Sequence, residues 1–173
     1  MLKTNRFIGF FRSFLILTCL LSLTSFQPVS DFYQLPRVKV IGVRDGDTID
    51  IITIEKFTIT IRLDGIDCPE KKQAFGEKAK QFTSDFSFGK YVRIKNNGKD
   101  GYGRVIGEVF NDKGVSLNKS LLKQGLAWHY KQYSKSAELA QLENEARKLK
   151  KGLWIDKNPI SPWEFRKLPK IKK

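Results

Sequence analysis

Three short polar stretches carry the side chains of this chain that could do chemistry. They read Asp-Gly-Asp-Thr at residues 45–48, Arg-Leu-Asp-Gly-Ile-Asp-Cys-Pro-Glu at residues 62–70, and Gly-Tyr-Gly-Arg at residues 101–104. Carboxylate oxygens are the ligands that a hard cation such as Ca²⁺ prefers. The planar fork of an arginine matches two oxygens of a phosphate. Together the three stretches predict a metal-dependent phosphodiesterase.

Each stretch taken alone is also compatible with an ordinary structural role. Asp45 begins an Asp-Gly pair that is typical of hairpin turns, residues 67–70 form a proline-containing turn, and an arginine such as Arg62 at a strand end is usually solvated. The first stretch is not an EF-hand loop. Counted from Asp45, the sixth position is Asp50, where glycine is needed, and the twelfth is Lys56, where glutamate is needed.

The charge of the chain predicts attraction to polyanions. Among 173 residues there are 32 Lys and Arg against 18 Asp and Glu, which gives a formal net charge of +14. Nucleic acid and an anionic membrane would both suit such a surface, and so would a basic soluble protein with no particular partner. A chain of this length with 40% hydrophobic residues is expected to build one core and therefore one domain with tails.

The first 30 residues have the pattern of an export signal. Lys3, Arg6 and Arg12 precede an uncharged run over residues 13–27. A basic start followed by a short apolar stretch is typical of a signal peptide, whereas a membrane span needs about 20 apolar residues. Since no small-x-small cleavage site is evident, an uncleaved signal anchor is the alternative. We expect an exported protein, secreted or periplasmic, with membrane association through residues 1–30 as the other outcome.

Cysteine and histidine are too scarce for a disulfide framework or a zinc site. The two cysteines are Cys19, inside the apolar run, and Cys68, so an exported chain would keep one lone thiol. The single histidine, His129, lies among aromatic residues and is expected to be packed or at the surface.

Five segments are predicted to be short β-strands, because Val, Ile and Thr recur in them between polar turns. They are residues 38–44, 48–54, 57–63, 91–95 and 105–110. Five short strands with a helix inserted before the fourth resemble an OB-type barrel, whose surface commonly binds single-stranded nucleic acid. The expected fold class is mostly β with helices, namely a five-stranded OB barrel with three α-helices, over residues 31–155.

The first of the three helices is predicted from an aromatic stripe. Phe75, Ala79, Phe82 and Phe86 recur at helical spacing and Gly89 follows as a stop. Such a stripe predicts core packing rather than a cofactor site.

The other two helices are predicted from capping residues. Ser116 is a plausible N-cap for a short helix that ends near Gly125, and Ser136 for a longer one that ends by Gly152. The residues of the longer helix that are expected to face inward are Leu139, Leu142, Ala146 and Leu149.

Residues 156–173 are predicted to be a basic tail. Three prolines interrupt it, so it cannot hold regular structure for long. Trp154 and Trp163 indicate that its first half docks on the domain.

The three polar stretches occur in the order and approximate spacing of one family. Over about residues 38–154 the sequence resembles the staphylococcal (micrococcal) nuclease, or thermonuclease, family. The resemblance implies a bound Ca²⁺ held by Asp47, by Asp67 and by the main-chain carbonyl of Cys68. It also implies a five-stranded OB barrel.

The resemblance further implies three catalytic residues, Arg62, Glu70 and Arg104. Negative charge builds on the phosphoryl oxygens when water attacks a phosphodiester, and a cation with two arginine forks stabilises that charge. Glu70 has the chemistry either to deprotonate the water or only to position it, and the sequence leaves both open. The stretches at residues 124–127 and 152–154 also resemble the family but carry no chemistry.

Two further positions and two departures bear on the substrate. Tyr102 and Tyr130 are candidates for contacting phosphate or stacking on a base, and packing at the barrel edge is the alternative for each. Cys68 stands where the prototype nuclease has threonine, which is harmless if only the carbonyl binds metal. Gly101 stands where the prototype has lysine, which removes one phosphate-facing charge.

The function we expect is therefore a Ca²⁺-dependent endonuclease that hydrolyses DNA and RNA without regard to the sugar. Products with 3′-phosphate ends are implied by the resemblance alone. The alternatives are a non-catalytic OB module that only binds nucleic acid, and a basic anchored protein that binds membrane but leaves the carboxylates unexplained. No protein partner is implied, and we expect a monomer.

Overall fold

The structure is a computed structural model that describes residues 29–169 of the chain. The chain divides into two units between Tyr33 and Gln34, and the second of them, from Gln34 onward, is compact. Helix α1 (Val29–Gln34) crosses this division. The predicted signal sequence at residues 1–30 thus lies almost entirely outside the described residues. Within the described residues, no helix is both long and apolar enough to cross a membrane.

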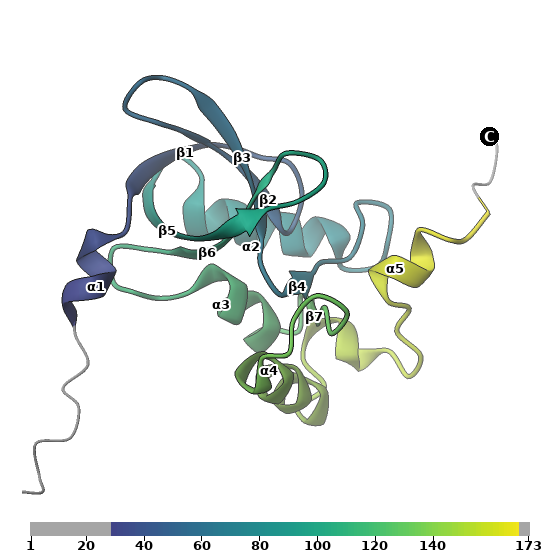
Figure 1. The fold of residues 1–173 in the computed structure, drawn as a ribbon. Coiled ribbons are helices and arrows are strands. Elements are labelled where there is room, and N and C mark those ends of the chain that lie inside the picture. The colour runs from purple at the N-terminus through teal and green to yellow at the C-terminus, as the bar shows by residue number, and fades with distance from the viewer. Residues whose placement is uncertain (1–28, 170–173) are drawn as a thin grey trace, which may run out of the picture. The chain divides into compact units, whose positions relative to one another are not determined.

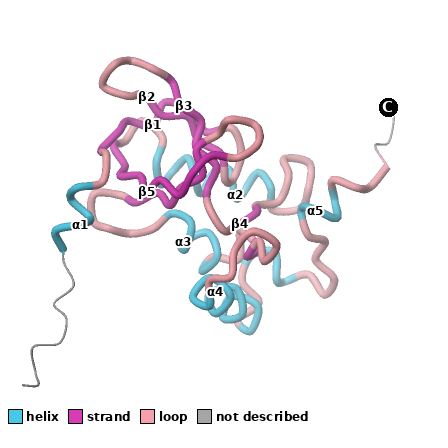
Figure 2. Tube along the Cα trace, in the orientation of Figure 1, coloured by secondary structure: helices cyan, strands magenta, loops and turns pink. Residues whose placement is uncertain are grey.

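Five strands close into a barrel in the spatial order β1-β2-β3-β6-β5. Figures 1 and 2 show these strands grouped together, with helices α3 and α4 on one side of them. Their bounds are β1 Arg37–Val43, β2 Thr48–Ile52, β3 Thr58–Leu63, β5 Tyr91–Lys99 and β6 Val105–Phe110. Neighbouring strands are antiparallel except β3 and β6, which run parallel. The expected five-stranded OB barrel is confirmed.

The register of β2 and β3 positions the first two polar stretches. Thr48 pairs with Arg62 across these strands, and the main-chain N–H of Leu63 donates to the carbonyl of Asp47 at 2.8 Å. The Asp-Gly-Asp turn therefore lies directly beside the end of β3, where Arg62 stands. The turn that begins at residue 45 and the residue Arg62 are far apart in sequence but lie side by side, because β2 and β3 form a hairpin.

A second, two-stranded sheet was not expected from the sequence. It pairs β4 (Ile66–Asp67) with β7 (Trp128–His129), and Asp67 is the partner of Trp128. Strands of two residues are too short to leave an alternation pattern. His129 is buried in this sheet, so of the two outcomes expected for it, packed or at the surface, the packed one is seen.

The three expected helices are present as α2 (Gly76–Ser87), α3 (Leu117–Lys123) and α4 (Ala137–Lys148). Ser116 accepts a hydrogen bond from the N–H of Lys119, and Ser136 accepts one from the N–H of Leu139, so both predicted N-caps are confirmed. In Figure 2 helices α3 and α4 lie together on one side of the barrel.

The prediction that Leu149 faces inward is wrong. Leu139, Leu142 and Ala146 are buried, but Leu149 is 65% exposed. The helix ends at Lys148, and the next residue but one has a left-handed φ of 48°. The 3.6-residue pattern would continue to Gly152, but the helix ends about one turn earlier. Leu149 therefore lies beyond the helix and does not face the core.

The core fills the barrel and continues under the helices. Its members are Val, Ile and Leu side chains of the strands together with apolar residues of α2, α3 and α4, among them Ile49, Ile61, Leu63, Val92, Val109, Ala79, Leu117, Leu121, Leu139 and Leu142. A smaller cluster of Ala146, Leu153 and Trp154 packs against Trp128 and Phe75. The aromatic stripe of the first predicted helix is confirmed as core packing, with Phe75, Phe82 and Phe86 partly buried against it.

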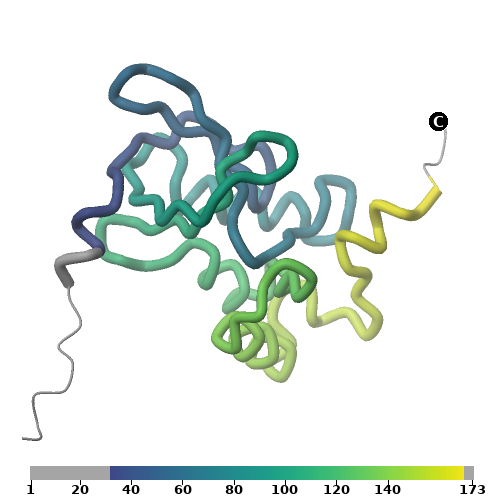
Figure 3. Tube along the Cα trace, viewed as in Figure 1, coloured from purple at the N-terminus to yellow at the C-terminus, as the bar shows by residue number. Residues whose placement is uncertain are grey.

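The C-terminal segment returns to the domain. After the short 3₁₀ helix η1 (Gly152–Ile155) it forms one further turn of helix, α5 (Pro162–Phe165). Figure 3 shows this segment in yellow, beside the turn that leads from β4 to α2. The docking expected from Trp154 and Trp163 is confirmed, since Trp154 is 6% exposed and the Trp163 ring stacks on Tyr130.

Candidate active site

The Asp-Gly-Asp turn between β1 and β2 packs tightly against two other elements. A Cβ atom on Gly46 would lie 2.7 Å from the Cβ of Cys68 and 2.8 Å from the Cβ of Ala79 on α2, so only glycine fits there. The hydroxyl of Thr83 on α2 donates to the carbonyl of Gly46. These contacts hold Asp47 against Cys68, the residue that follows Asp67.

Arg62 joins the two candidate metal carboxylates. Its Nη1 lies 2.9 Å from Oδ2 of Asp47, and its Nη2 lies 2.7 Å from Oδ1 of Asp67. Nη1 also donates to the carbonyl of Ile66 at 3.1 Å, and the N–H of Cys68 donates to Oδ2 of Asp47 at 2.6 Å. The guanidinium therefore ties the turn of Asp47 to strand β4, from which Ile66 and Asp67 come.

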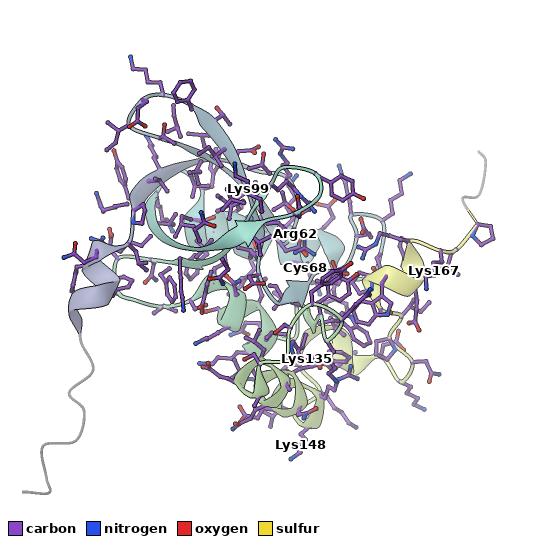
Figure 4. All side chains as sticks on the ribbon, in the orientation of Figure 1. Arg62, Cys68, Lys99, Lys135, Lys148 and Lys167 are labelled. Carbon is purple, nitrogen blue, oxygen red and sulfur yellow. The ribbon has the colours of Figure 1, made fainter. Side chains whose placement is uncertain are left out.

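Burial disfavours the charged forms of the side chains in this cluster. The side chains of Asp47, Asp67 and Arg62 are 7%, 2% and 13% exposed. Burial raises the pKa of Asp47 to about 7, against the lowering effect of Arg62. Burial acts to lower the pKa of Arg62, but Asp47 and Asp67 more than offset it. Figure 4 labels Arg62 and Cys68 close to each other in this region.

The donor set fits a hard cation bound through oxygen. Asp47 and Asp67 supply carboxylate oxygens, which Ca²⁺ and Mg²⁺ prefer. The Cys68 thiol is buried, and burial raises its pKa well above the usual value, so it stays protonated and is a poor ligand. In the part of the chain that the structure describes, no three His, Cys, Asp or Glu side chains are grouped as a metal site. A cation held here would thus need further oxygens from main chain, water or substrate.

Glu70 follows the carboxylate cluster and is held by its own turn. Its N–H donates to Oε1 of Gln73 at 3.1 Å, and its carbonyl accepts from the N–H of Gln73 at 2.8 Å. A Cβ atom on Gly76 would lie 1.9 Å from that carbonyl, so the close approach of α2 requires glycine. The carboxylate of Glu70 is 40% exposed and can be reached from solvent.

Residues 60–156 match the family model described as staphylococcal nuclease homologue. The chain belongs to the staphylococcal nuclease family. It is 42% identical over 133 residues to an uncharacterized endonuclease of Haemophilus influenzae, covering 77% of this chain and 74% of that protein. It is 36% identical over 144 residues to a micrococcal nuclease of Shigella flexneri, covering 78% and 82%. The expected family is thereby confirmed.

Arg104 is also a predicted site residue of the staphylococcal nuclease pattern. The structure does not place it in contact with the carboxylates. It follows the hairpin loop between β5 and β6, and its Nε lies 2.7 Å from Oδ2 of Asp100. Its guanidinium also lies 5.6 Å from the centroid of the Tyr102 ring. Both residues line a hollow of about 410 Å³ together with Arg44 and Lys99. The lining thus includes three basic side chains, Arg44, Lys99 and Arg104, and no acidic one, as would suit a phosphate.

The two candidate tyrosines lie in contrasting surroundings. Tyr102 is 88% exposed at the tip of the loop, where nothing prevents contact with a ligand. Tyr130 is half-buried, with its ring stacked on that of Trp163 at 5.2 Å and with Tyr133 edge-on at 4.8 Å. The packing role that the sequence left open is the one seen for Tyr130, and a role in binding substrate stays a prediction for both.

Arg166 is the site residue that sequence reasoning missed. Its Nη2 lies 2.7 Å from Oδ2 of Asp67, and its Nη1 lies 2.7 Å from Oε1 of Glu70. Burial acts to lower the pKa of Arg166, but the hydrogen bonds to Asp67 and Glu70 more than offset this and raise it. In the sequence Arg166 is one basic residue of a basic tail, and only the docking signal of Trp163 pointed to this region.

Proposed function

We propose that this chain is a Ca²⁺-dependent, sugar-non-specific endonuclease that hydrolyses phosphodiester bonds of DNA and RNA and leaves 3′-phosphate ends. The observation that carries the proposal is the buried pair of carboxylates, Asp47 and Asp67, bridged by Arg62 at 2.9 and 2.7 Å beside Glu70. The nuclease names of the relatives support the same reaction class.

The residues of the site divide the work of hydrolysis. Asp47 and Asp67, with the carbonyl of Cys68, would hold the cation. When bound, Ca²⁺ supplies positive charge that stabilises the phosphoryl oxygens and lowers the pKa of a nearby water. The guanidinium of Arg62 lies at these carboxylates, so it can donate to a phosphoryl oxygen there and stabilise the charge that grows on it.

Glu70 is the group suited to the attacking water. Its carboxylate oxygen accepts hydrogen bonds and is open to solvent, so it can orient a water or take its proton. Attack at phosphorus with departure of the 5′-oxygen leaves the phosphate on the 3′ side. Arg104, on its exposed loop, would turn from Asp100 toward the phosphate when substrate is bound.

The non-catalytic alternative, an OB module that only binds nucleic acid, is disfavoured by the residue set. Arg62, Asp67, Glu70 and Arg104 are all present, whereas a copy that had lost catalysis would have no need to keep them. A membrane-binding role would leave the buried carboxylates without a purpose.

The test is cleavage by the purified full chain of end-labelled DNA and RNA, with Ca²⁺, with Mg²⁺ and with a chelator. We expect cleavage of both polymers with Ca²⁺ and little or none in the other two conditions, since a site of few protein ligands suits a large, flexible ion and Mg²⁺ demands tight octahedral geometry. Full activity in chelator, or equal rates with both ions, would contradict the proposal.

The control variant is Glu70→Gln, which keeps the shape of the side chain. Cleavage should fall by about 10²- to 10⁴-fold, while binding of the labelled DNA in chelator should persist. Equal cleavage by Glu70→Gln would remove Glu70 from the mechanism, and binding without cleavage by the parent chain would favour the OB module.

The proposal includes export of the chain as a monomer, with residues 1–30 as signal peptide or anchor. Expression in a bacterial host followed by fractionation and mass determination tests this. An activity confined to the cytosol, with the N-terminus intact, would contradict export.

A further inference from the structure

The C-terminal segment places two side chains on groups that the reaction needs. Arg166 contacts Asp67 and Glu70, and Trp163 covers one face of the Tyr130 ring. Both side chains come from α5 or the residue after it, so a single short segment makes both contacts.

This segment is anchored and does not merely lie against the surface. Ser161 and Pro162 are buried, and Ser161 forms a capping box with Glu164. The side-chain amide of Gln73 donates to the carbonyl of Ile160. Gln73 also holds the turn of Glu70, so the segment is tied to the same turn that positions that carboxylate.

Arg166 takes oxygens that a cation and the attacking water would use. Asp67 has Oδ1 bonded to Arg62 and Oδ2 bonded to Arg166, at 2.7 Å each, which occupies both of its oxygens. Oε1 of Glu70 is bonded to the other nitrogen of Arg166. A guanidinium in this position supplies the positive charge that a bound cation would supply, and the two would repel each other at close range.

Trp163 occupies a position that a base would use. The two rings of Trp163 and Tyr130 are parallel to within 1° at a centroid separation of 5.2 Å. Flat stacking of this kind is how aromatic side chains bind the bases of single strands. The face of Tyr130 that the indole covers is therefore closed to a nucleotide while the segment stays docked.

We propose that the segment of residues 159–166 is an internal occupant of the active site, in which Arg166 stands in for the metal ion and Trp163 for a base, and that Ca²⁺ and nucleic acid displace it. This inference rests on the proposed function. The segment then controls access to the active site. In the resting state Arg166 neutralises the carboxylates and Trp163 covers Tyr130. A metal ion must displace Arg166 from Asp67 before it binds there.

The first test measures Ca²⁺ affinity by calorimetry on the chelator-treated full chain, without nucleic acid. Arg166→Ala should bind Ca²⁺ about three- to tenfold more tightly than the parent, the range expected when two partly exposed ion pairs cease to compete. Arg166→Lys should lie between the two, because it keeps the charge but cannot contact both carboxylates. Arg166 is 43% exposed, so none of these changes should prevent folding.

The matched control is Lys167→Ala, which removes the same charge from the next residue. Lys167 is exposed, and Figure 4 labels it beside α5. The affinity of the Lys167→Ala chain for Ca²⁺ should stay within about twofold of that of the parent, since exposed charges that do not contact the site are largely screened. Equal tightening in Lys167→Ala and Arg166→Ala would mean a general charge effect and would overturn the proposal.

The second test follows the segment itself by hydrogen exchange. Protection of the amides of residues 163–166 in the parent chain should fall when Ca²⁺ is added, and fall further with a single-stranded oligonucleotide. Unchanged protection, or unchanged or weaker Ca²⁺ binding in Arg166→Ala, would overturn the internal-occupant proposal while leaving the nuclease assignment intact. Absence of Ca²⁺ binding in every variant would overturn both.

Discussion

The two halves of the candidate site differ in how firmly their side chains are held in place before substrate binds. The carboxylate side, with Asp47, Asp67 and Arg62, is buried, and its hydrogen bonds join the turn between β1 and β2 to strands β3 and β4. The loop side is more open, since Tyr102 is exposed and Arg104 is half-buried, and the ion pair of Arg104 joins residues four apart in sequence.

This difference indicates a division between structure and substrate binding. Side chains on the buried half cannot move without breaking contacts with several segments, so changes there should affect both folding and activity. Within residues 29–169 the partners of Tyr102 and Arg104 come from their own loop, so these side chains can turn toward a ligand and changes there should affect activity alone. Substitutions in both halves test this division.

Arg62 should give the largest effect, because it serves both structure and catalysis. Arg62→Ala would leave the buried carboxylate of Asp47 without its guanidinium partner and Asp67 with Arg166 alone, which we expect to lower the free energy of unfolding by about 3–5 kcal/mol. Arg62→Lys keeps the charge without the fork and should lower kcat by about 10²- to 10³-fold. Urea denaturation and steady-state DNA cleavage measure the two effects. A parental kcat in Arg62→Lys would remove Arg62 from the transition state.

Arg104 should separate activity from stability. Arg104→Lys should lower kcat by about 10²-fold or more, while the free energy of unfolding stays within about 0.5 kcal/mol of the parent. The reason is that the ion pair with Asp100 is partly exposed and local. The same two assays apply. A loss of stability comparable to that of Arg62→Ala would show that the loop half is also structural, and the division would fail.

A pair of glycine substitutions should give a smaller but clear contrast. In Gly76→Ala the new Cβ would lie 1.9 Å from the carbonyl of Glu70, whereas Gly101→Ala adds a Cβ with nothing within 4 Å. We expect Gly76→Ala to move Glu70, to lower the free energy of unfolding by about 1–3 kcal/mol and to slow cleavage at least about tenfold.

Gly101→Ala is the matched control for that change and should be close to neutral in both denaturation and cleavage assays. A neutral result for Gly76→Ala would show that the turn relaxes freely, and that the position of Glu70 does not depend on α2.

Cys68 should give the smallest effect. Its N–H holds Asp47 at 2.6 Å, and neither Cys68→Ala nor Cys68→Thr removes that N–H or the carbonyl. Both variants should keep Ca²⁺-dependent cleavage within about threefold of the parent, because the thiol is not expected to bind an oxygen-preferring ion.

Calcium titration of cleavage under reducing conditions measures this for the parent and for both Cys68 variants. Loss of Ca²⁺ activation in both, with the fold unchanged, would refute the carbonyl as a ligand. Zn²⁺ or Cd²⁺ binding that disappears in Cys68→Ala would instead indicate a thiolate site.

Local sequence patterns determined most of the barrel and its helices. The five strands and the caps at Ser116 and Ser136 were predictable because alternation and capping act within a few residues. The errors follow the same reasoning. Leu149 continued a 3.6-residue pattern past the point where the backbone turns, and β4 and β7 are too short to leave a pattern.

The sequence also predicted which residues could act, since the three polar stretches resemble one family and membership of that family is confirmed. Only the tertiary structure decided where their partners lie. Arg166 meets Asp67 across 99 residues of sequence, and Trp163 meets Tyr130 across the loop and helix between them. Such contacts depend on the return path of the chain, set by burial of Trp154, Ser161 and Pro162. A basic tail carries no local periodicity from which that path could be predicted, because its direction is a property of the packed core.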